Sequence, residues 1–235
     1  MESVVVDVQR ELLEKADPAR RESGKNFFKE DVRLHGVSSA EVTKIAKKFL
    51  ARLKHASKQD VFSLCEKLWQ SGFLEEGGIA CIWSQSRKKD FEPEDFTVFE
   101  RWLGTYVHNW ASCDTLCNHT LGDFLRMFPD HVKRLRQWAG LPNRWMKRGA
   151  AVSLIIPARN GLFLEDVFSI ADDLLLDPDD MVQKGYGWML KAASQAHPDE
   201  VFAYVMGKKD SMPRTAYRYA LEKMPKECRA EAMKK

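Results

Sequence analysis

The stretch Lys147-Arg148-Gly149-Ala150 has a counterpart 36 residues later in Gln183-Lys184-Gly185-Tyr186, where a basic residue again precedes glycine. Extending this register along the chain gives Glu76, Ser112, Arg148, Lys184 and Arg214, the last step being 30 residues. The residues that follow these positions are small: Gly77, Cys113, Gly149, Gly185 and Thr215. Such a period, with two helices per unit, is typical of an α-solenoid. Chance alignment of helical segments is the alternative.

Apolar residues recur at helical spacing along nearly the whole chain. Glycine and proline divide the chain after residue 70 into segments of about one helix each, at Gly72, Pro93, Pro129, Pro142, Gly161, Pro178, Pro198 and Pro213. Few segments alternate apolar and polar residues as a half-buried strand does. The predicted fold is therefore all-α, a curved solenoid of HEAT-like helical repeats with a concave basic face.

Several local predictions concern the first 70 residues. Val4, Val8, Leu12 and Leu13 form one apolar stripe, which ends at Asp17-Pro18. A short helix is expected around Phe27 and Phe28. Ser38 and Glu41 have the spacing of a capping box for a helix that carries Val42, Ile45, Ala46, Phe49, Leu50 and Leu53. Residues 57 to 60 start a further helix.

Composition limits the class of protein. The 235 residues are 44% hydrophobic and 30% charged, which suits one domain over residues 1–235, with amino-terminal helices at 1–56 and paired-helix repeats at 57–235. The start of the chain lacks the pattern of a secretion signal, and no apolar run is long enough to cross a membrane. Five cysteines, an odd number, argue against a disulfide framework. A soluble, cytoplasmic protein with reduced cysteines is expected.

Charge is strongly segregated in the second half of the chain. Residues 131–159 contain seven basic residues and no acid, whereas residues 160–183 contain seven acids and no base. If the two helices of each pair lie on opposite surfaces, the acidic helix lies outside and the basic second helices line the concave side. A concave basic surface suits nucleic-acid phosphates. The alternative is that these charges form ordinary solvated faces.

The motifs in combination resemble the bacterial AlkD-type DNA alkylation repair glycosylases over nearly the full length. The resemblance is carried by Gly36-Val37 with the capped helix, Trp110 with Asp114, Thr120-Leu121-Gly122-Asp123-Phe124, and residues 144–151 and 183–190. It implies an all-α array of HEAT-like repeats that holds duplex DNA and removes N3- and N7-alkylated purines. It also implies that the alkylated base stays within the duplex during the reaction.

The resemblance also implies roles for single residues. Asp114 matches the catalytic aspartate, and Trp110 and Trp188 match the tryptophans that face the lesion. Arg148 matches the arginine that binds the DNA backbone, and Phe27 stands where better-studied members have a tyrosine. The DNA contacts expected in all are Arg148, Lys147, Lys184, Lys191, Arg214 and Phe27.

The chemistry of the residues agrees with this activity. An N3- or N7-alkylated purine is a cationic leaving group that needs no acid. The Asp114 carboxylate can stabilise the oxocarbenium-like sugar and orient water, and the two indoles can make cation–π contacts with the charged nucleotide. No cofactor or metal is expected. The protein is expected to be a monomer whose partner is double-stranded DNA that contains alkylated purines. Binding to DNA would associate it with the nucleoid.

Other interpretations remain open for the same residues. Trp110 and Trp188 can be core aromatics, as expected for Trp69, Trp83, Trp102, Trp138 and Trp145. Asp114 can cap a helix, and Phe27 and Phe28 can anchor the amino-terminal helices. Cys113, Cys117 and His119 match no common zinc spacing. The alternative function is a non-enzymatic HEAT-like scaffold that binds DNA structures or a protein partner; the joint presence of Trp110, Asp114, Arg148 and Trp188 favours the enzyme.

Overall fold

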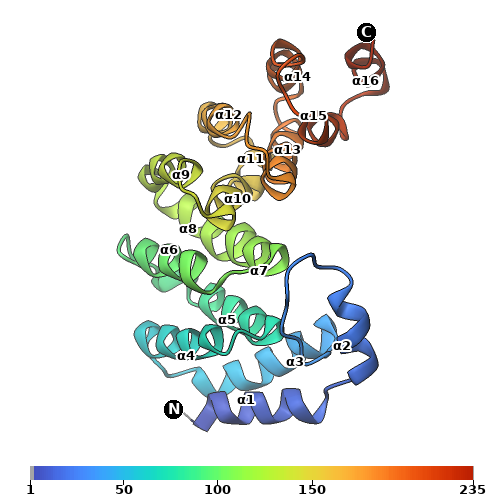
Figure 1. The fold of residues 1–235 in the computed structure, drawn as a ribbon. Coiled ribbons are helices and arrows are strands. Elements are labelled where there is room, and N and C mark those ends of the chain that lie inside the picture. The colour runs from blue at the N-terminus through green and yellow to red at the C-terminus, as the bar shows by residue number, and fades with distance from the viewer. Residues whose placement is uncertain (1–2, 235) are drawn as a thin grey trace. The chain divides into compact units, whose positions relative to one another are not determined.

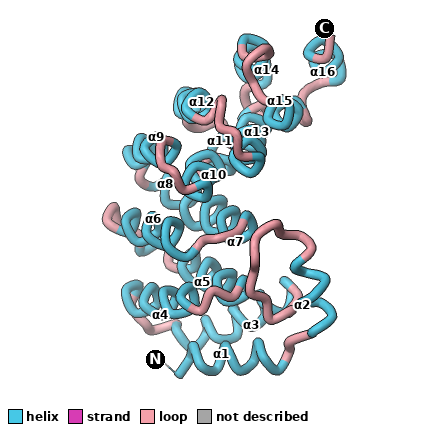
Figure 2. The backbone as a smooth tube through the Cα atoms, viewed as in Figure 1, coloured by secondary structure: helices cyan, strands magenta, loops and turns pink. Residues whose placement is uncertain are grey.

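The computed structural model describes residues 3–234 and confirms the all-α prediction (Figures 1 and 2). Within that range the only extended pairing is an isolated bridge between Arg33 and Phe73. No helix within residues 3–234 is long and apolar enough to cross a membrane. All five cysteines are free, as predicted.

Contacts divide the chain into two compact units, Met1–Leu116 and Cys117–Lys235. The sequence-based distinction between amino-terminal helices at 1–56 and paired-helix repeats at 57–235 stays a prediction. The description of the chain as one domain, its curvature and its concave basic face stay predictions.

The amino-terminal unit is built from α-helices that pack in two rows. The helices are α1 (Ser3–Glu14), α2 (Pro18–Lys25), α3 (Ser39–Leu50), α4 (Lys58–Gln70), α5 (Leu74–Ser86), α6 (Asp95–Tyr106) and α7 (Trp110–Thr115), with 3-10 turns at Ala51–Leu53 and Lys88–Asp90. Helices α3, α5 and α7 pack in succession, while α1 packs on α3, and α4 packs on α5 and α6 (Figure 1). Apart from α2, which has no buried residue, these helices thereby bury apolar side chains on their neighbours.

The carboxy-terminal unit repeats this arrangement. Its helices are α8 (Gly122–Met127), α9 (Val132–Ala139), α10 (Arg144–Val152), α11 (Ile155–Arg159), α12 (Leu164–Asp173), α13 (Asp180–Ala193), α14 (Pro198–Gly207), α15 (Arg214–Leu221) and α16 (Lys226–Ala232), with a 3-10 turn at Pro129–His131. Helices α10, α13 and α15 pack in succession, and α9 packs on α12. A π-helix, η3 (Leu116–Leu121), precedes α8.

The 36-residue register corresponds to real structural positions. Its five members, Glu76, Ser112, Arg148, Lys184 and Arg214, lie on α5, α7, α10, α13 and α15, which are the helices that stack within the two units. Small residues after them do permit close approach: a Cβ atom on Gly77 would lie 2.7 Å from the Trp69 ring, and one on Gly185 would lie 3.2 Å from Arg148 Cγ. The repeat therefore reflects packing and not chance alignment.

Some local predictions were wrong. Phe27 and Phe28 lie in the turn after α2 and not within a helix. Leu13 is 64% exposed, although Val4, Val8 and Leu12 are buried as predicted. Ser38 caps α3 by accepting a hydrogen bond from Glu41 N, but the Glu41 carboxylate pairs with lysines instead of completing a capping box. That reciprocal box forms at Ser57 and Asp60.

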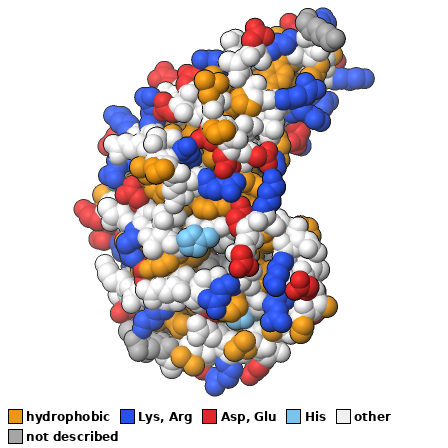
Figure 3. Space-filling model, viewed as in Figure 1, with side chains coloured by type: hydrophobic (Ala, Val, Ile, Leu, Met, Phe, Trp, Pro, Cys, Tyr) orange, Lys and Arg blue, Asp and Glu red, His pale blue; other side chains and the backbone are white. Residues whose placement is uncertain are grey.

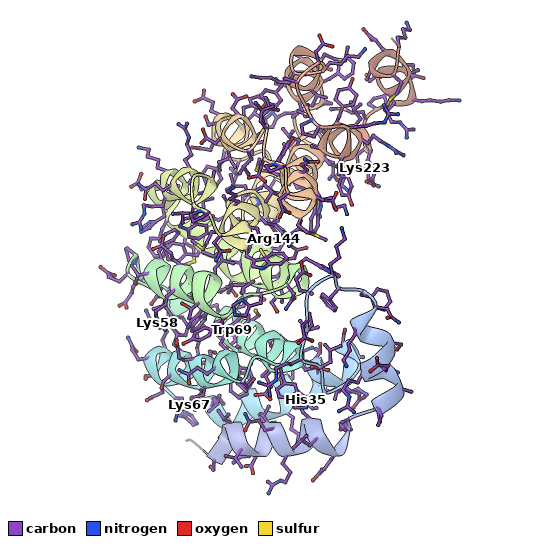
Figure 4. All side chains as sticks on the ribbon, in the orientation of Figure 1. His35, Lys58, Lys67, Trp69, Arg144 and Lys223 are labelled. Atoms are coloured by element: carbon purple, nitrogen blue, oxygen red, sulfur yellow. The ribbon has the colours of Figure 1, made fainter. Side chains whose placement is uncertain are left out.

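The five tryptophans expected in the core are all buried, between 0% and 6% exposed: Trp69, Trp83, Trp102, Trp138 and Trp145. Trp69, labelled in Figure 4, lies at the point where α4 meets α5 and α6. The indole of Trp83 donates to the Ala46 carbonyl 2.9 Å away. Large apolar area buried in this way is the main stabilising contribution in each unit.

A carboxylate joins α4 to α6 inside the amino-terminal unit. Glu66 accepts hydrogen bonds from Arg101, from the Trp102 indole and from the Tyr106 hydroxyl at 2.6 Å. Burial by itself raises the pKa of Glu66, but these three donors together lower that pKa below its ordinary value of 4.5.

This pKa predicts an acid dependence of stability. Because the pKa of Glu66 is depressed in the folded state, the ionised side chain adds to the free energy of unfolding above pH 4.5. This stabilisation is lost as pH falls through the pKa of the folded state. Glu66→Gln should therefore be less stable than wild type at pH 6, and the difference should narrow below pH 4.5. Denaturant unfolding of both proteins at several pH values measures this, and a difference that is constant with pH would contradict it.

Candidate functional site

The predicted catalytic helix α7 exposes Trp110 and Asp114 on one face. Asn109 caps the helix by accepting a hydrogen bond from Ser112 N at 2.8 Å. Ser112 and Cys113 are buried, whereas Trp110 and Asp114 are half-buried. Residues four apart in a helix lie one above the other, so the indole and the carboxylate share the exposed face.

The structure excludes the capping alternative for Asp114. The cap of α7 is Asn109, and Asp114 lies in the last turn of the helix. After Thr115, the last residue of α7, the chain changes from α-helix to the π-helix η3. Single-turn π-helices are rare and are frequently found at functional sites.

Trp110 is held by the turn that follows α2. Its indole nitrogen donates to the Phe27 carbonyl at 3.2 Å, and its ring stacks on Phe28 with centroids 5.5 Å apart. Trp110 is therefore not an ordinary core residue. The Phe27 ring is 75% exposed, so the interpretation of Phe27 as a core anchor was wrong; its contact with DNA stays a prediction.

A pocket of about 490 Å³ lies beside Trp110, between α2, α3, α5 and α7. Apolar side chains dominate its lining, among them Phe28, Val42, Ile82 and Trp110. Several hydroxyls in the wall already have partners within the chain: Ser38, Thr43, Ser112 and Thr115. Arg20 is the exposed cation of the lining. The pocket therefore suits an apolar group close to an anion.

Buried carboxylates fix the loop that reaches this pocket. Glu75, 7% exposed at the start of α5, accepts hydrogen bonds from the backbone amides of His35, Gly36 and Val37 at 2.8 to 3.1 Å. The neighbouring Glu76 contacts Nε2 of His35 at 2.9 Å; His35 is labelled in Figure 4. Gly36 has a φ of +88°, and a Cβ atom there would lie 2.3 Å from the Asp17 carbonyl oxygen, so only glycine fits.

Sequence reasoning missed the role of Glu75. Its position in the first turn of a helix is typical of acids that interact with the helix dipole, and such residues are common on surfaces. The partners of Glu75 lie 38 to 40 residues away, so local spacing gave no signal for them.

Trp188 lies between two lysines on one face of α13. Lys184, Trp188 and Lys191 are half-buried at spacings of four and three, whereas Tyr186, Met189 and Leu190 are fully buried. The exposed stripe of α13 therefore carries an aromatic ring flanked by cations. Trp188 is thus at the surface of its unit, and the interpretation of it as a core aromatic was wrong.

The predicted DNA-binding lysines are paired with acids within the carboxy-terminal unit. Lys147 contacts Asp177 at 2.6 Å, Lys184 contacts Asp180 at 2.7 Å, and Lys191 contacts Glu222 at 2.9 Å. The acids after α12 thus lie among the basic residues. On the face seen in Figure 3, acidic and basic side chains are likewise interspersed. A phosphate would have to compete with these carboxylates.

The two predicted arginines differ sharply in exposure. Arg148 is 5% exposed, and its Nη1 donates to the Met181 carbonyl at 2.5 Å while its side chain packs on Gly185. It therefore joins α10 to α13. Arg214 is exposed at the start of α15. Its role as a phosphate contact, like that of Arg148, stays a prediction.

The structure distributes the predicted site over the two units. Phe27, Trp110 and Asp114 belong to the amino-terminal unit, and the first two are in contact. The other predicted residues belong to the carboxy-terminal unit: Lys147, Arg148, Lys184, Trp188, Lys191 and Arg214. Among residues 3–234, no three histidine, cysteine, aspartate or glutamate side chains are grouped to hold a metal ion.

Comparisons with known proteins identify the family. The family model described as DNA alkylation repair enzyme matches residues 8–224, so the chain belongs to this family. Its fold is similar to that of a solved structure described as a predicted DNA alkylation repair enzyme from Enterococcus faecalis, with a TM-score of 0.80 and 16% sequence identity. That match covers 90% of this chain and 98% of the other. No curated protein sequence matches the chain.

Proposed function

We propose that this protein is a monofunctional DNA glycosylase that hydrolyses the N-glycosidic bond of positively charged N3- and N7-alkylated purines in duplex DNA. Membership in the DNA alkylation repair family supports a role in alkylation repair. The observation that carries the finer proposal is the half-buried pair on α7, where Trp110 and Asp114 share one helix face.

The proposed reaction needs one carboxylate. The bond between C1′ of the sugar and the purine nitrogen breaks, and its electron pair leaves with the alkylated base, which becomes neutral. Positive charge develops on the sugar, where the ionised Asp114 carboxylate stabilises it. The same carboxylate orients the water that adds to C1′, and the proton that this water loses passes to bulk solvent.

Trp110 and Trp188 would supply the preference for a charged lesion. An indole face attracts a cation by about 0.5–2 kcal/mol, and a neutral purine gains none of this term. Phe28 stacks on Trp110 and fixes the ring, which reduces the entropy lost when a nucleotide binds.

The cations of the carboxy-terminal unit would hold the DNA backbone. Lys147, Lys184, Lys191 and Arg214 would contact phosphates, the three lysines by exchanging a carboxylate partner for a phosphate. Arg148 has little exposed surface, so it would hold α10 against α13 and offer only a guanidinium edge to a phosphate.

The purified protein should release N7-methylguanine and N3-methyladenine from methylated duplex DNA in the presence of a metal chelator, because the leaving group is already cationic and Asp114 supplies the stabilising charge. Chromatography of the freed bases measures this, with protein-free DNA as the control for spontaneous loss. If no base is released above that control at any salt concentration, the scaffold function is favoured instead.

A further inference from the structure

Helix α2 contributes no buried residue to the core. None of the side chains from Pro18 to Lys25 is buried, and three of the eight residues are basic against one acid. A helix that is polar on all sides gains little from burial. Its amino-terminal end is fixed locally, because Asp17 accepts hydrogen bonds from the Ala19 and Arg20 amides and Pro18 occupies the first turn.

The position of α2 is tied to the proposed active site. The turn after it places the Phe27 carbonyl on the Trp110 indole and the Phe28 ring against the same indole. Arg20 and Gly24 of α2 line the pocket that Trp110 also lines. The polar helix α2 therefore lines the same apolar pocket as Trp110. The turn after α2 contacts this tryptophan, which is proposed to face the lesion.

The arginines of α2 also differ from the lysines of the carboxy-terminal unit in their pairing. Arg20 and Arg21 are exposed, and neither side chain forms an ion pair or hydrogen bond with any residue between 3 and 234. Asp17 is occupied by backbone amides, and Glu22 pairs with Lys25 at 3.3 Å. Each of these unpaired guanidinium groups can bind one phosphate through two hydrogen bonds, and no carboxylate has to be displaced first.

We infer that Arg20 and Arg21 form a phosphate-binding site on α2 that holds the DNA backbone beside Trp110. This inference rests on the proposed function for its ligand. Arg20 faces the pocket, and Arg21, whose Cβ lies beside Gly36, faces the loop that Glu75 fixes. The guanidinium groups add positive charge at the point where the amino-terminal unit meets the lesion, and they are independent of the paired lysines.

The double variant Arg20→Gln/Arg21→Gln tests the inference. Each phosphate contact contributes about 0.9 to the slope of log K against log salt concentration on duplex DNA. The salt dependence of the variant should therefore be weaker, with a slope shallower by about 1.8 on an undamaged duplex. Lys15→Gln/Lys48→Gln is the matched control, since it removes the same charge from lysines of this unit that are paired with Glu41 and Glu11. Arg20→Lys/Arg21→Lys should retain the wild-type slope.

The outcomes separate this site from the catalytic proposal. A wild-type slope in the Arg20→Gln/Arg21→Gln protein, with wild-type thermal stability, overturns the phosphate site. An equal decrease in the control variant also overturns it, because net charge alone would then explain the change. Base release is measured separately on methylated duplex DNA. If the wild-type protein releases no base but its salt dependence of binding still weakens in the Arg20→Gln/Arg21→Gln variant, the phosphate site stands and the glycosylase proposal is rejected.

Discussion

Replacing Asp114 with asparagine is expected to slow release of N7-methylguanine from duplex DNA by about 100-fold or more, with little change in affinity for the same duplex. Asparagine keeps the shape of the side chain but carries no negative charge to place against the developing positive sugar. Because that charge exists only in the transition state, the loss falls on the chemical step and not on binding.

Single-turnover kinetics with excess protein separate these two steps. The rate of base release at saturating protein reports the chemical step, and the protein concentration that gives half of that rate reports affinity. Asp199→Asn is a matched control, since it makes the same change at an exposed position in the first turn of α14. A wild-type rate in the Asp114→Asn protein would remove this carboxylate from the mechanism, and an equal loss in both variants would assign the effect to net charge.

Helices and their order could be predicted from the sequence because the signals are local. The apolar spacing after Ser38 and the Ser57 cap correspond to α3 and α4. The 36-residue register falls on helices that stack in succession, since Gly77 and Gly185 stand where a larger side chain would meet a neighbouring helix. Such constraints recur in every repeat and therefore leave a periodic trace.

The segment between α2 and α3 could not be predicted in this way. Phe27 and Phe28 are aromatic and adjacent, which suggested a buried helix, but their position is set by Trp110, which is 83 residues away in the sequence from Phe27. The change to a π-helix at Leu116 is also unmarked in the apolar pattern. A long-range partner, Trp110, thus fixes the position of Phe27 and Phe28.

Charge runs were informative about composition but not about pairing. The basic run that includes Lys147 and the acidic run that includes Asp177 suggested separate surfaces, yet these two side chains lie 2.6 Å apart. Register likewise placed Arg148 on the right helix but did not reveal that its guanidinium is buried against Met181. A linear sequence gives the helix and the position along it, whereas rotation about the helix axis depends on neighbours.

The same long-range support suggests how the site is kept rigid. The segment that contains α2 begins at Asp17 and ends at Gly36, and these two residues lie against each other. Glu75 on α5 accepts a hydrogen bond from the Gly36 amide at the end of this segment. Trp110 in turn is held by that segment through Phe27 and Phe28. Catalytic and binding groups act best when the packing around them restricts their motion. Stability of this loop and activity at α7 should therefore be coupled.

Glu75→Ala is expected to lower the free energy of unfolding by about 3 kcal/mol, because three backbone amides lose a buried acceptor. The loop can recover part of this loss by opening to water, so the His35, Gly36 and Val37 amides should exchange hydrogen much faster than in wild type. Denaturant unfolding measures the first effect, and residue-resolved hydrogen exchange measures the second.

Two substitutions give this expectation its sharpest test. Glu75→Gln keeps one acceptor oxygen, which can serve Gly36 and Val37 but not His35, so its loss should be about half that of Glu75→Ala. Glu94→Ala, at an exposed position that makes no side-chain cap for α6, should change little. If Glu75→Ala unfolds like wild type and its three amides exchange slowly, other groups hold the loop. If the loop opens, Trp110 loses its two partners and base release should fall although Asp114 is intact.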